Sequence, residues 1–210
     1  MNVDCYLSLI SDTQFKMNIK RSVFIGHAAH CESEEKAKEF IREISRRFKD
    51  ATHNCWAYKV NMNGVEKFNF SDAGEPHGSA GRPIFSAIES LNMTNIVVVV
   101  TRYFGGIKLG VRGLIDAYNS TARKTLEMGQ KGKYCPGKRF SIEIDYSMWN
   151  TFIGKFAQGK DFNIVDVEYG TSVRATLTCK SENFKALADF FVERRIPIEE
   201  LGRVVFVERL

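Results

Sequence analysis

The chain has 210 residues, 44% of them hydrophobic and 26% charged, with a formal net charge of +5. These are globular proportions for one large or two small domains, and they exclude a disordered chain, a collagen and a coiled coil. The longest aliphatic run, residues 96–100, is far shorter than the roughly 18 residues of a membrane span. Because the first residues also lack the basic segment of a signal peptide, we expect a cytoplasmic protein with no membrane partner.

Hydrophobic periodicity and turn residues divide the first part of the chain into alternating strands and helices. The continuous valine run at residues 97–100 indicates a strand that is buried on both faces. Ser33 stands where it would cap the first helix, ahead of two glutamates that suit a helix N-terminus. The predicted strands cover residues 14–19, 23–30, 53–60, 65–70 and 95–103, with a turn at 63–64, and the predicted helices cover 33–48, 83–91 and 111–126.

A segment rich in glycine and lysine, residues 129–139, indicates an exposed connection between two domains. Residues 1–139 carry 21 basic and 14 acidic side chains, a net charge of +7, whereas residues 140–210 carry a net charge of −2. The positive first part is compatible with a polyanionic partner, although many globular proteins have such a surplus without one. We predict domains at 1–132 and 139–210, with a linker at 133–138.

The second domain is predicted to have the element order βαββαβ, which is the ferredoxin-like arrangement. Its helices show apolar stripes at helical spacing, and its strands alternate or are rich in β-branched residues. Ser181 is the predicted cap of the second helix. The predicted strands cover residues 140–146, 162–169, 173–180 and 203–208, and the predicted helices cover 148–157 and 184–191.

Two glycine-rich loops each connect a predicted strand to a predicted helix: SDAGEPHGSAG at 71–81 and FGGIKLG at 104–110. A helix N-terminus attracts anions, and glycine lets a ligand approach the backbone. One interpretation is an anion or nucleic-acid site where the loops meet, and the other is that the glycines only satisfy tight turns. The residues assigned to this site are His77, Arg82, Arg102, Gly105, Gly106, Lys108 and Arg112.

Other chemistry has less support in the sequence. Neither loop has the P-loop or Rossmann pattern, and the five cysteines form no CxxC pair. We therefore expect free thiols, no metal and no cofactor. His53 with Glu75 is the candidate acid–base pair for catalysis, and the alternative is that His53 only supports the loop. No aromatic pair like that of the RNP motifs lies on a predicted strand, so base stacking is not indicated.

Three motifs together resemble the IMPACT family and its bacterial, YigZ-like branch. They are HNCWAY at 53–58, SDAGEPHGSAGRP at 71–83 and VVVVTRYFGGIKLG at 97–110. The resemblance implies an α+β protein whose first domain is a β-α sandwich like domain 2 of ribosomal protein S5. It also implies a second domain like one of elongation factor G. This chain departs from the family pattern at Ala73, Arg112 and Asp116. One interpretation of Arg112 and Asp116 is that the basic charge has moved one turn toward the helix N-terminus, and the other is that the anion site is altered or lost.

The eukaryotic members of this family regulate translation through protein partners, whereas the bacterial branch has no settled role. The first functional hypothesis is accordingly a translation-linked binding protein, which holds RNA, a ribosomal surface or a protein partner through its basic first domain. The alternative is an enzyme that acts on a small phosphorylated or peptide-like substrate between the two loops. The sequence does not predict the oligomeric state.

Overall fold

The computed structural model describes residues 5–62, 64–156 and 162–210 of a mixed α+β protein. The chain divides into two compact units. The N-terminal unit comprises Tyr6–Lys133 with the last two residues, and the C-terminal unit comprises Tyr134–Glu208 with Cys5. The chain passes from the first unit to the second within one long strand, β7 (Lys131–Ile144).

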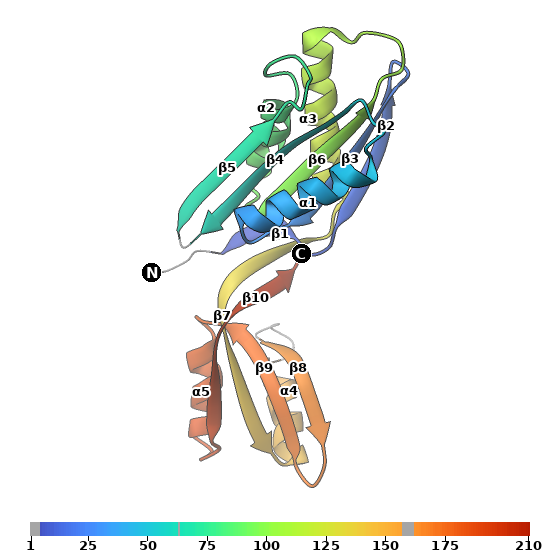
Figure 1. Cartoon of the computed structure of the whole chain (residues 1–210). Helices are drawn as coiled ribbons and strands as arrows, with labels where there is room; N and C mark the ends of the chain where they lie inside the picture. The colour runs from blue at the N-terminus through green and yellow to red at the C-terminus, as the bar shows by residue number, and fades with distance from the viewer. Residues whose placement is uncertain (1–4, 63, 157–161) are drawn as a thin grey trace. The chain divides into compact units, whose positions relative to one another are not determined.

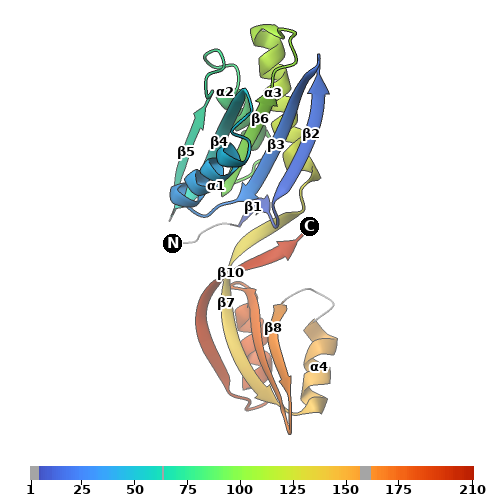
Figure 2. The same ribbon diagram turned by 45° about the vertical axis from the view of Figure 1, so that its right-hand side comes forward.

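A five-stranded sheet with the order β2-β3-β6-β4-β5 forms the centre of the N-terminal unit. Its neighbouring strands are all antiparallel. Helix α1 covers one face of the sheet, and helices α2 and α3 cover the other (Figures 1 and 2). The strands are β2 (Thr13–Ile19), β3 (Ser22–His30), β4 (His53–Met62), β5 (Val65–Ser71) and β6 (Ile96–Tyr103), and the helices are α1 (Glu34–Arg47), α2 (Gly81–Ser90) and α3 (Gly110–Met128).

Strand β6 lies in the middle of this sheet and contributes to two cores. Val97 and Val99 pack in the cluster under α1, while Val98 and Val100 pack in the cluster under α2 and α3. Because side chains alternate along a strand, Arg102 also points toward the α2/α3 side. Burial of the valine run on both faces is therefore confirmed, and the same periodicity places a charged side chain at the end of an apolar core.

The predicted elements of this unit are present, with ends shifted by one or two residues. The Ser33 cap is confirmed, since its hydroxyl accepts a hydrogen bond from the Lys36 N–H at 3.3 Å. A short strand, β1 (Tyr6–Leu9), was not predicted from the sequence. Of the predicted turn at 63–64, Asn63 lies outside the described residues.

The C-terminal unit has the observed order β7, α4 (Tyr146–Phe156), β8 (Phe162–Tyr169), β9 (Val173–Lys180), α5 (Phe184–Val192) and β10 (Ile198–Arg209). Strand β7 lies between β10 and β9, and β9 pairs with β8 on its other side. Both helices contribute phenylalanines to one apolar core. The ring of Phe152 is at its centre and contacts the rings of Phe156, Phe162, Phe190 and Phe191.

Two local expectations differ from the observed structure. Residues 133–138, expected as a linker, lie within β7, where Gly137 allows close packing of the strands. A Cβ at Gly137 would come within 2.7 Å of the Cys179 carbonyl oxygen and 2.8 Å of Phe206. The predicted Ser181 cap is wrong, because α5 begins at Phe184 after Asn183. Ala157, the predicted last residue of α4, is outside the described range.

The cysteines are not all free thiols as expected. A disulfide joins Cys5 to Cys135 within the C-terminal unit, with the two Cα atoms 4.2 Å apart. Cys31, Cys55 and Cys179 are free and buried. The disulfide could not be predicted from the spacing of the cysteines, because Cys5 and Cys135 are 130 residues apart in the sequence.

Candidate functional site

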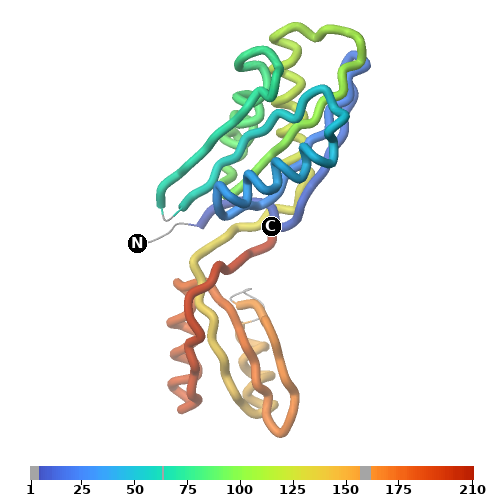
Figure 3. Tube along the Cα trace, in the orientation of Figure 1, coloured from blue at the N-terminus to red at the C-terminus, as the bar shows by residue number. Residues whose placement is uncertain are grey.

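The candidate site lies at one end of the N-terminal sheet, where β3 and β4 begin and β6 ends. Arg102 on β6 is directly opposite His53 on β4 and Phe24 on β3. Neighbours in register share a face of the sheet, so these three side chains gather on the α2/α3 side. Figure 3 traces the three segments that meet here: the turn between β2 and β3, the loop before α2 and the loop before α3.

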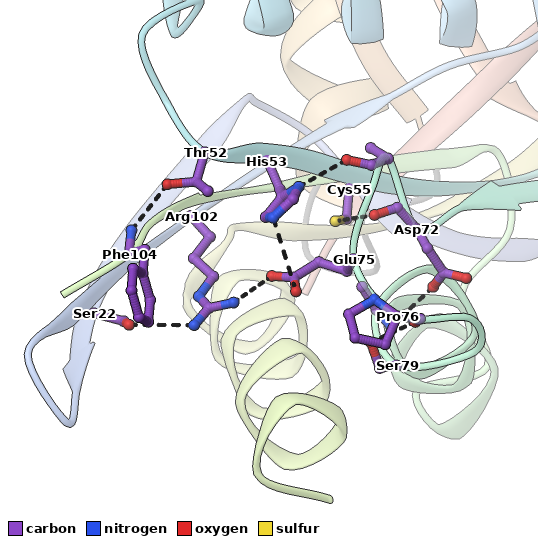
Figure 4. Close-up of polar contacts among 12 residues, drawn as sticks. Ser22, Thr52, His53, Cys55, Asp72, Glu75, Pro76, Ser79, Arg102 and Phe104 are labelled. Atoms are coloured by element: carbon purple, nitrogen blue, oxygen red, sulfur yellow. Dashed lines mark hydrogen bonds and ion pairs between the residues drawn. The ribbon is translucent and has the colours of Figure 1, made fainter. Parts of the chain in front are cut away.

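A buried ion pair forms the centre of the site (Figure 4). Arg102 Nη1 donates to Glu75 Oε1 at 2.6 Å, and the side chains are only 6% and 3% exposed. The Tyr118 hydroxyl donates to the same oxygen at 2.7 Å, and Arg102 Nη2 contacts Ser22 Oγ at 3.4 Å. Arg102 was predicted to bind an anionic ligand. Its charge is instead balanced by Glu75, the carboxylate that the sequence analysis had assigned to catalysis.

His53 is held in a defined orientation beside this pair. Its Nδ1 lies 2.9 Å from the Ala73 carbonyl oxygen, and because a carbonyl oxygen only accepts, Nδ1 carries the hydrogen. The Nε2 atom of neutral His53 then has a lone pair, and it lies 3.9 Å from Glu75 Oε2. That separation exceeds a direct hydrogen bond. The two predicted acid–base residues are therefore neighbours whose nitrogen and oxygen atoms are not hydrogen-bonded.

Two further groups at the site stay neutral near pH 7. Burial raises the pKa of the Cys55 thiol to about 12, and its sulfur donates to the Asp72 carbonyl oxygen at 2.8 Å. Burial also raises the pKa of the Tyr118 hydroxyl, and the adjacent Cys55 and Glu75 raise it further. A thiol must lose its proton to act as a nucleophile, so Cys55 has a structural role here.

The loop before α2 binds a carboxylate of its own chain. The two oxygens of Asp72 accept from the N–H groups of Gly78, Ala80 and Gly81 at 2.8–3.0 Å. Burial alone would raise the pKa of Asp72, but these three donors outweigh it and hold the pKa below its usual 3.8. The N-terminus of α2 therefore has an internal anion where an external phosphate was expected.

Two side chains that reach solvent here are His77 in the first loop and Arg82 in the first turn of α2. The His77 side chain is fully exposed, and its Nδ1 lies 4.0 Å from Asp72 Oδ2. Arg82 is exposed, with its guanidinium 5.9 Å from the Phe70 ring centre and 5.7 Å from that of Phe85. Both residues keep the accessibility that binding of an external anion requires.

The loop before α3 is anchored by hydroxyl groups from neighbouring strands. The Phe104 N–H donates to Thr52 Oγ1 at 3.0 Å, and the Gly105 N–H donates to Ser22 Oγ at 3.2 Å. Gly106, Lys108 and Arg112 are exposed beyond this anchor. Helix α3 starts without a side-chain cap, because the preceding residue is Leu109. The second loop therefore presents cations beside a helix N-terminus that no side chain caps.

Sequence reasoning missed Tyr118 and Ser22 as parts of the site. Tyr118 was counted in the apolar stripe of its helix, although a buried tyrosine hydroxyl needs a partner, and that requirement was the available signal. Ser22 carried no signal, since its hydroxyl oxygen accepts hydrogen bonds from residues 80 and 83 positions later in the chain. Over the residues that the structure describes, no group of His, Cys, Asp or Glu is arranged to hold a metal.

The fold and the site define an α+β protein with a buried Arg–Glu pair beneath two glycine-rich loops. The profile of the Impact N-terminal domain matches residues 20–126, and the chain belongs to the IMPACT family. IMPACT family member YvyE of Bacillus subtilis is 39% identical over 90% of this chain and 86% of that protein. IMPACT family member YigZ of Escherichia coli is 32% identical over 82% of this chain and 86% of that protein.

A solved structure, described as that of a hypothetical protein, is similar to almost the whole chain. It covers 95% of this chain and 98% of its own, with a TM-score of 0.63 and 25% sequence identity. None of the helices in the described ranges is both long enough and apolar enough to cross a membrane.

Proposed function

We propose that this chain is a translation-linked regulatory protein that binds RNA through exposed cations of its N-terminal unit. The translation link comes from its family, whose eukaryotic members regulate translation. The observation that carries the binding proposal is the exposure of the cations Arg82, Lys108 and Arg112 around the two loops, with the exposed His77 imidazole beside them. RNA affinity depends largely on the neutralisation of phosphates by such side chains. A cytoplasmic location would suit this role.

Arg102 has a different part in this proposal from the one expected. Because it is buried and paired with Glu75, it supports the loops and does not contact the ligand. Its substitution would therefore weaken RNA binding only through damage to the fold. The seven residues assigned to the anion site reduce to six: His77, Arg82, Gly105, Gly106, Lys108 and Arg112.

The proposal also includes a specific fold for each of the two units. We infer that the N-terminal unit, with domain bounds near 1–132, is a β-α sandwich like domain 2 of ribosomal protein S5. We infer that the C-terminal unit, near 139–210, is ferredoxin-like. The βαββαβ element order and the strand neighbours β10-β7-β9-β8 support the second assignment.

The test is a titration of labelled RNA with the wild-type protein and with two single variants, Arg82→Gln and Lys108→Gln. Each variant removes one exposed charge of the N-terminal unit, so each is expected to raise the Kd several-fold at low salt. Lys185→Gln removes an exposed charge from α5 of the C-terminal unit and is the matched control. Equal affinities for all four proteins, or no binding by wild type, would contradict the proposal.

A second candidate function is an enzyme that acts on a small phosphorylated or peptide-like substrate. The orientation of His53 favours it, because Nδ1–H is fixed to Ala73 and Nε2 is left to accept a proton beside Glu75. A panel of phosphorylated metabolites and short peptides should then give turnover by wild type. The His53→Ala variant should have none, and His77→Ala should keep it. Full turnover by His53→Ala would exclude this role.

A further inference from the structure

One exposed aromatic ring stands beside the second loop and has no part in the apolar cores. Phe104 follows directly after β6, and 46% of it is exposed. Phe24, the other aromatic ring in contact with the Arg102 guanidinium, is completely buried. An isolated exposed phenylalanine is common on protein surfaces, so its surroundings decide whether it has a function.

The backbone that carries this ring is unusually constrained. The N–H groups of Phe104 and Gly105 are fixed by hydrogen bonds that they donate to the hydroxyl oxygens of Thr52 and Ser22. A Cβ at Gly105 would come within 2.1 Å of the Arg21 carbonyl, so the loop lies directly against the turn between β2 and β3. A fixed aromatic ring loses little conformational entropy when a ligand stacks on it.

The inner face of the Phe104 ring is covered by a cation. The Arg102 guanidinium lies 5.4 Å from the ring centre, and it also lies 5.5 Å from the ring centre of Phe24. The guanidinium occupies one face of the ring. The other face is left for stacking on a flat ring such as a nucleobase.

Exposed cations lie in two segments of the chain close to this ring. Lys20 and Arg21 form the turn that packs against Gly105, both with positive φ angles of 44° and 66°. Lys108 and Arg112 follow in the loop and in the first turn of α3. Aromatic rings set among basic side chains are the arrangement by which proteins bind single-stranded nucleic acids.

We propose that Phe104 is a stacking platform for an unpaired base, and that the ligand of this loop is single-stranded RNA. The inference rests on the proposed function and makes it more specific. Phosphates on either side of the stacked base would meet Lys20 and Arg21 on one flank and Lys108 and Arg112 on the other. The sequence had not indicated stacking, because Phe104 lies at the end of its strand and has no aromatic partner on a neighbouring one.

The test compares three ligands: an oligouridylate of about 12 nucleotides, an RNA duplex of the same length, and inorganic polyphosphate. Phe104→Leu keeps an apolar side chain but removes the ring. It is expected to weaken oligouridylate binding about tenfold and to leave polyphosphate binding unchanged. Phe68→Leu, at a second exposed phenylalanine on β5 that stacks on Phe85, is the matched control and should bind all three ligands normally.

Phe104→Trp adds a direct readout, because the indole should retain oligouridylate binding and its fluorescence should be quenched when a base stacks on it. Wild type that binds all three ligands equally, with no effect of Phe104→Leu, would overturn the stacking platform and leave the proposed RNA binding in place. Equal losses for polyphosphate and oligouridylate in Phe104→Leu would also overturn it. Failure of wild type to bind any of the three would overturn both proposals.

Discussion

Glu75 needs a positively charged partner, whereas the surface glutamates of this protein are stabilised by water. Its carboxylate is almost fully buried and receives hydrogen bonds from Arg102 and Tyr118 on one oxygen. Removal of one partner of a buried pair leaves the other charge without compensation, which costs more than the pair itself contributes. In the Lys59–Glu66 pair, at 3.0 Å, the glutamate side chain is 53% exposed, so water screens the pair and it contributes little.

Glu75→Gln is therefore expected to lower the free energy of unfolding by about 3 kcal/mol or more. The substitution keeps the shape of the side chain but leaves the buried Arg102 charge unbalanced. Urea unfolding followed by circular dichroism measures the loss. Glu66→Gln is the control and should change the stability by less than about 1 kcal/mol. Similar values for the two variants would contradict the assignment of a buried pair.

His27 predicts a dependence of stability on pH. Burial, helped by the positive charge of Arg47, lowers the pKa of His27 from 6.5 to about 4, so the unfolded chain takes up a proton on this residue first. Its contribution is complete above pH 6.5 and is lost as the pH falls toward 4, by roughly 3 kcal/mol in all. His27→Leu should lack this part of the pH dependence. Parallel stability–pH curves for the two proteins would show the assignment to be wrong.

At the scale of the secondary-structure elements, local patterns predicted most of the fold. Amphipathic periodicity located the helices, and β-branched runs located β6, because these signals are contained within the segment itself. The prediction for the region of β7 was wrong because it also used only signals within the segment itself. Its glycines and proline are turn signals locally, and only contact with β9 and β10 makes Gly137 a strand residue.

The position of the candidate site could be predicted from the sequence, but the pairing of its charged side chains could not. Two glycine loops beside a predicted strand end indicated where the side chains gather. That Arg102 pairs with Glu75, 27 residues earlier, depends on how the loop before α2 lies against the end of β6, which no local pattern contains. The same holds for Asp72, whose position in the loop before α2 gave no indication that it fills the N-terminus of that helix.

Gly105 shows how strictly the second loop is packed. A methyl group there would overlap the Arg21 backbone, so Gly105→Ala is expected to destabilise the protein by about 2–3 kcal/mol. Gly154, in the exposed part of α4, has open space around it and an ordinary φ angle. Gly154→Ala should instead stabilise by about 0.5–1 kcal/mol. Thermal unfolding should show a lower Tm for Gly105→Ala and a higher Tm for Gly154→Ala. An unchanged Tm for Gly105→Ala would contradict the close approach of Gly105 to the Arg21 backbone.

At the scale of the whole molecule, charge is divided between the two parts of the chain. The first 139 residues have a net charge of +7, and the remainder has a net charge of −2. Long-range attraction of a polyanion depends on such a surplus. Sequence alone predicts this division, but it does not predict which cations are free. In the structure, Arg102 and Lys59 have carboxylate partners, while Lys108 and Arg112 are exposed.

The most direct test of RNA binding by the N-terminal unit is the salt dependence of single-stranded RNA affinity. It is measured for wild type, for Lys108→Gln/Arg112→Gln and for the control Lys185→Gln. The logarithm of the association constant should fall steeply with the logarithm of salt concentration. In the double variant the slope should become shallower by about 0.7 for each lost phosphate contact. A slope that is the same in all three proteins, or binding that does not depend on salt, would contradict the proposed function.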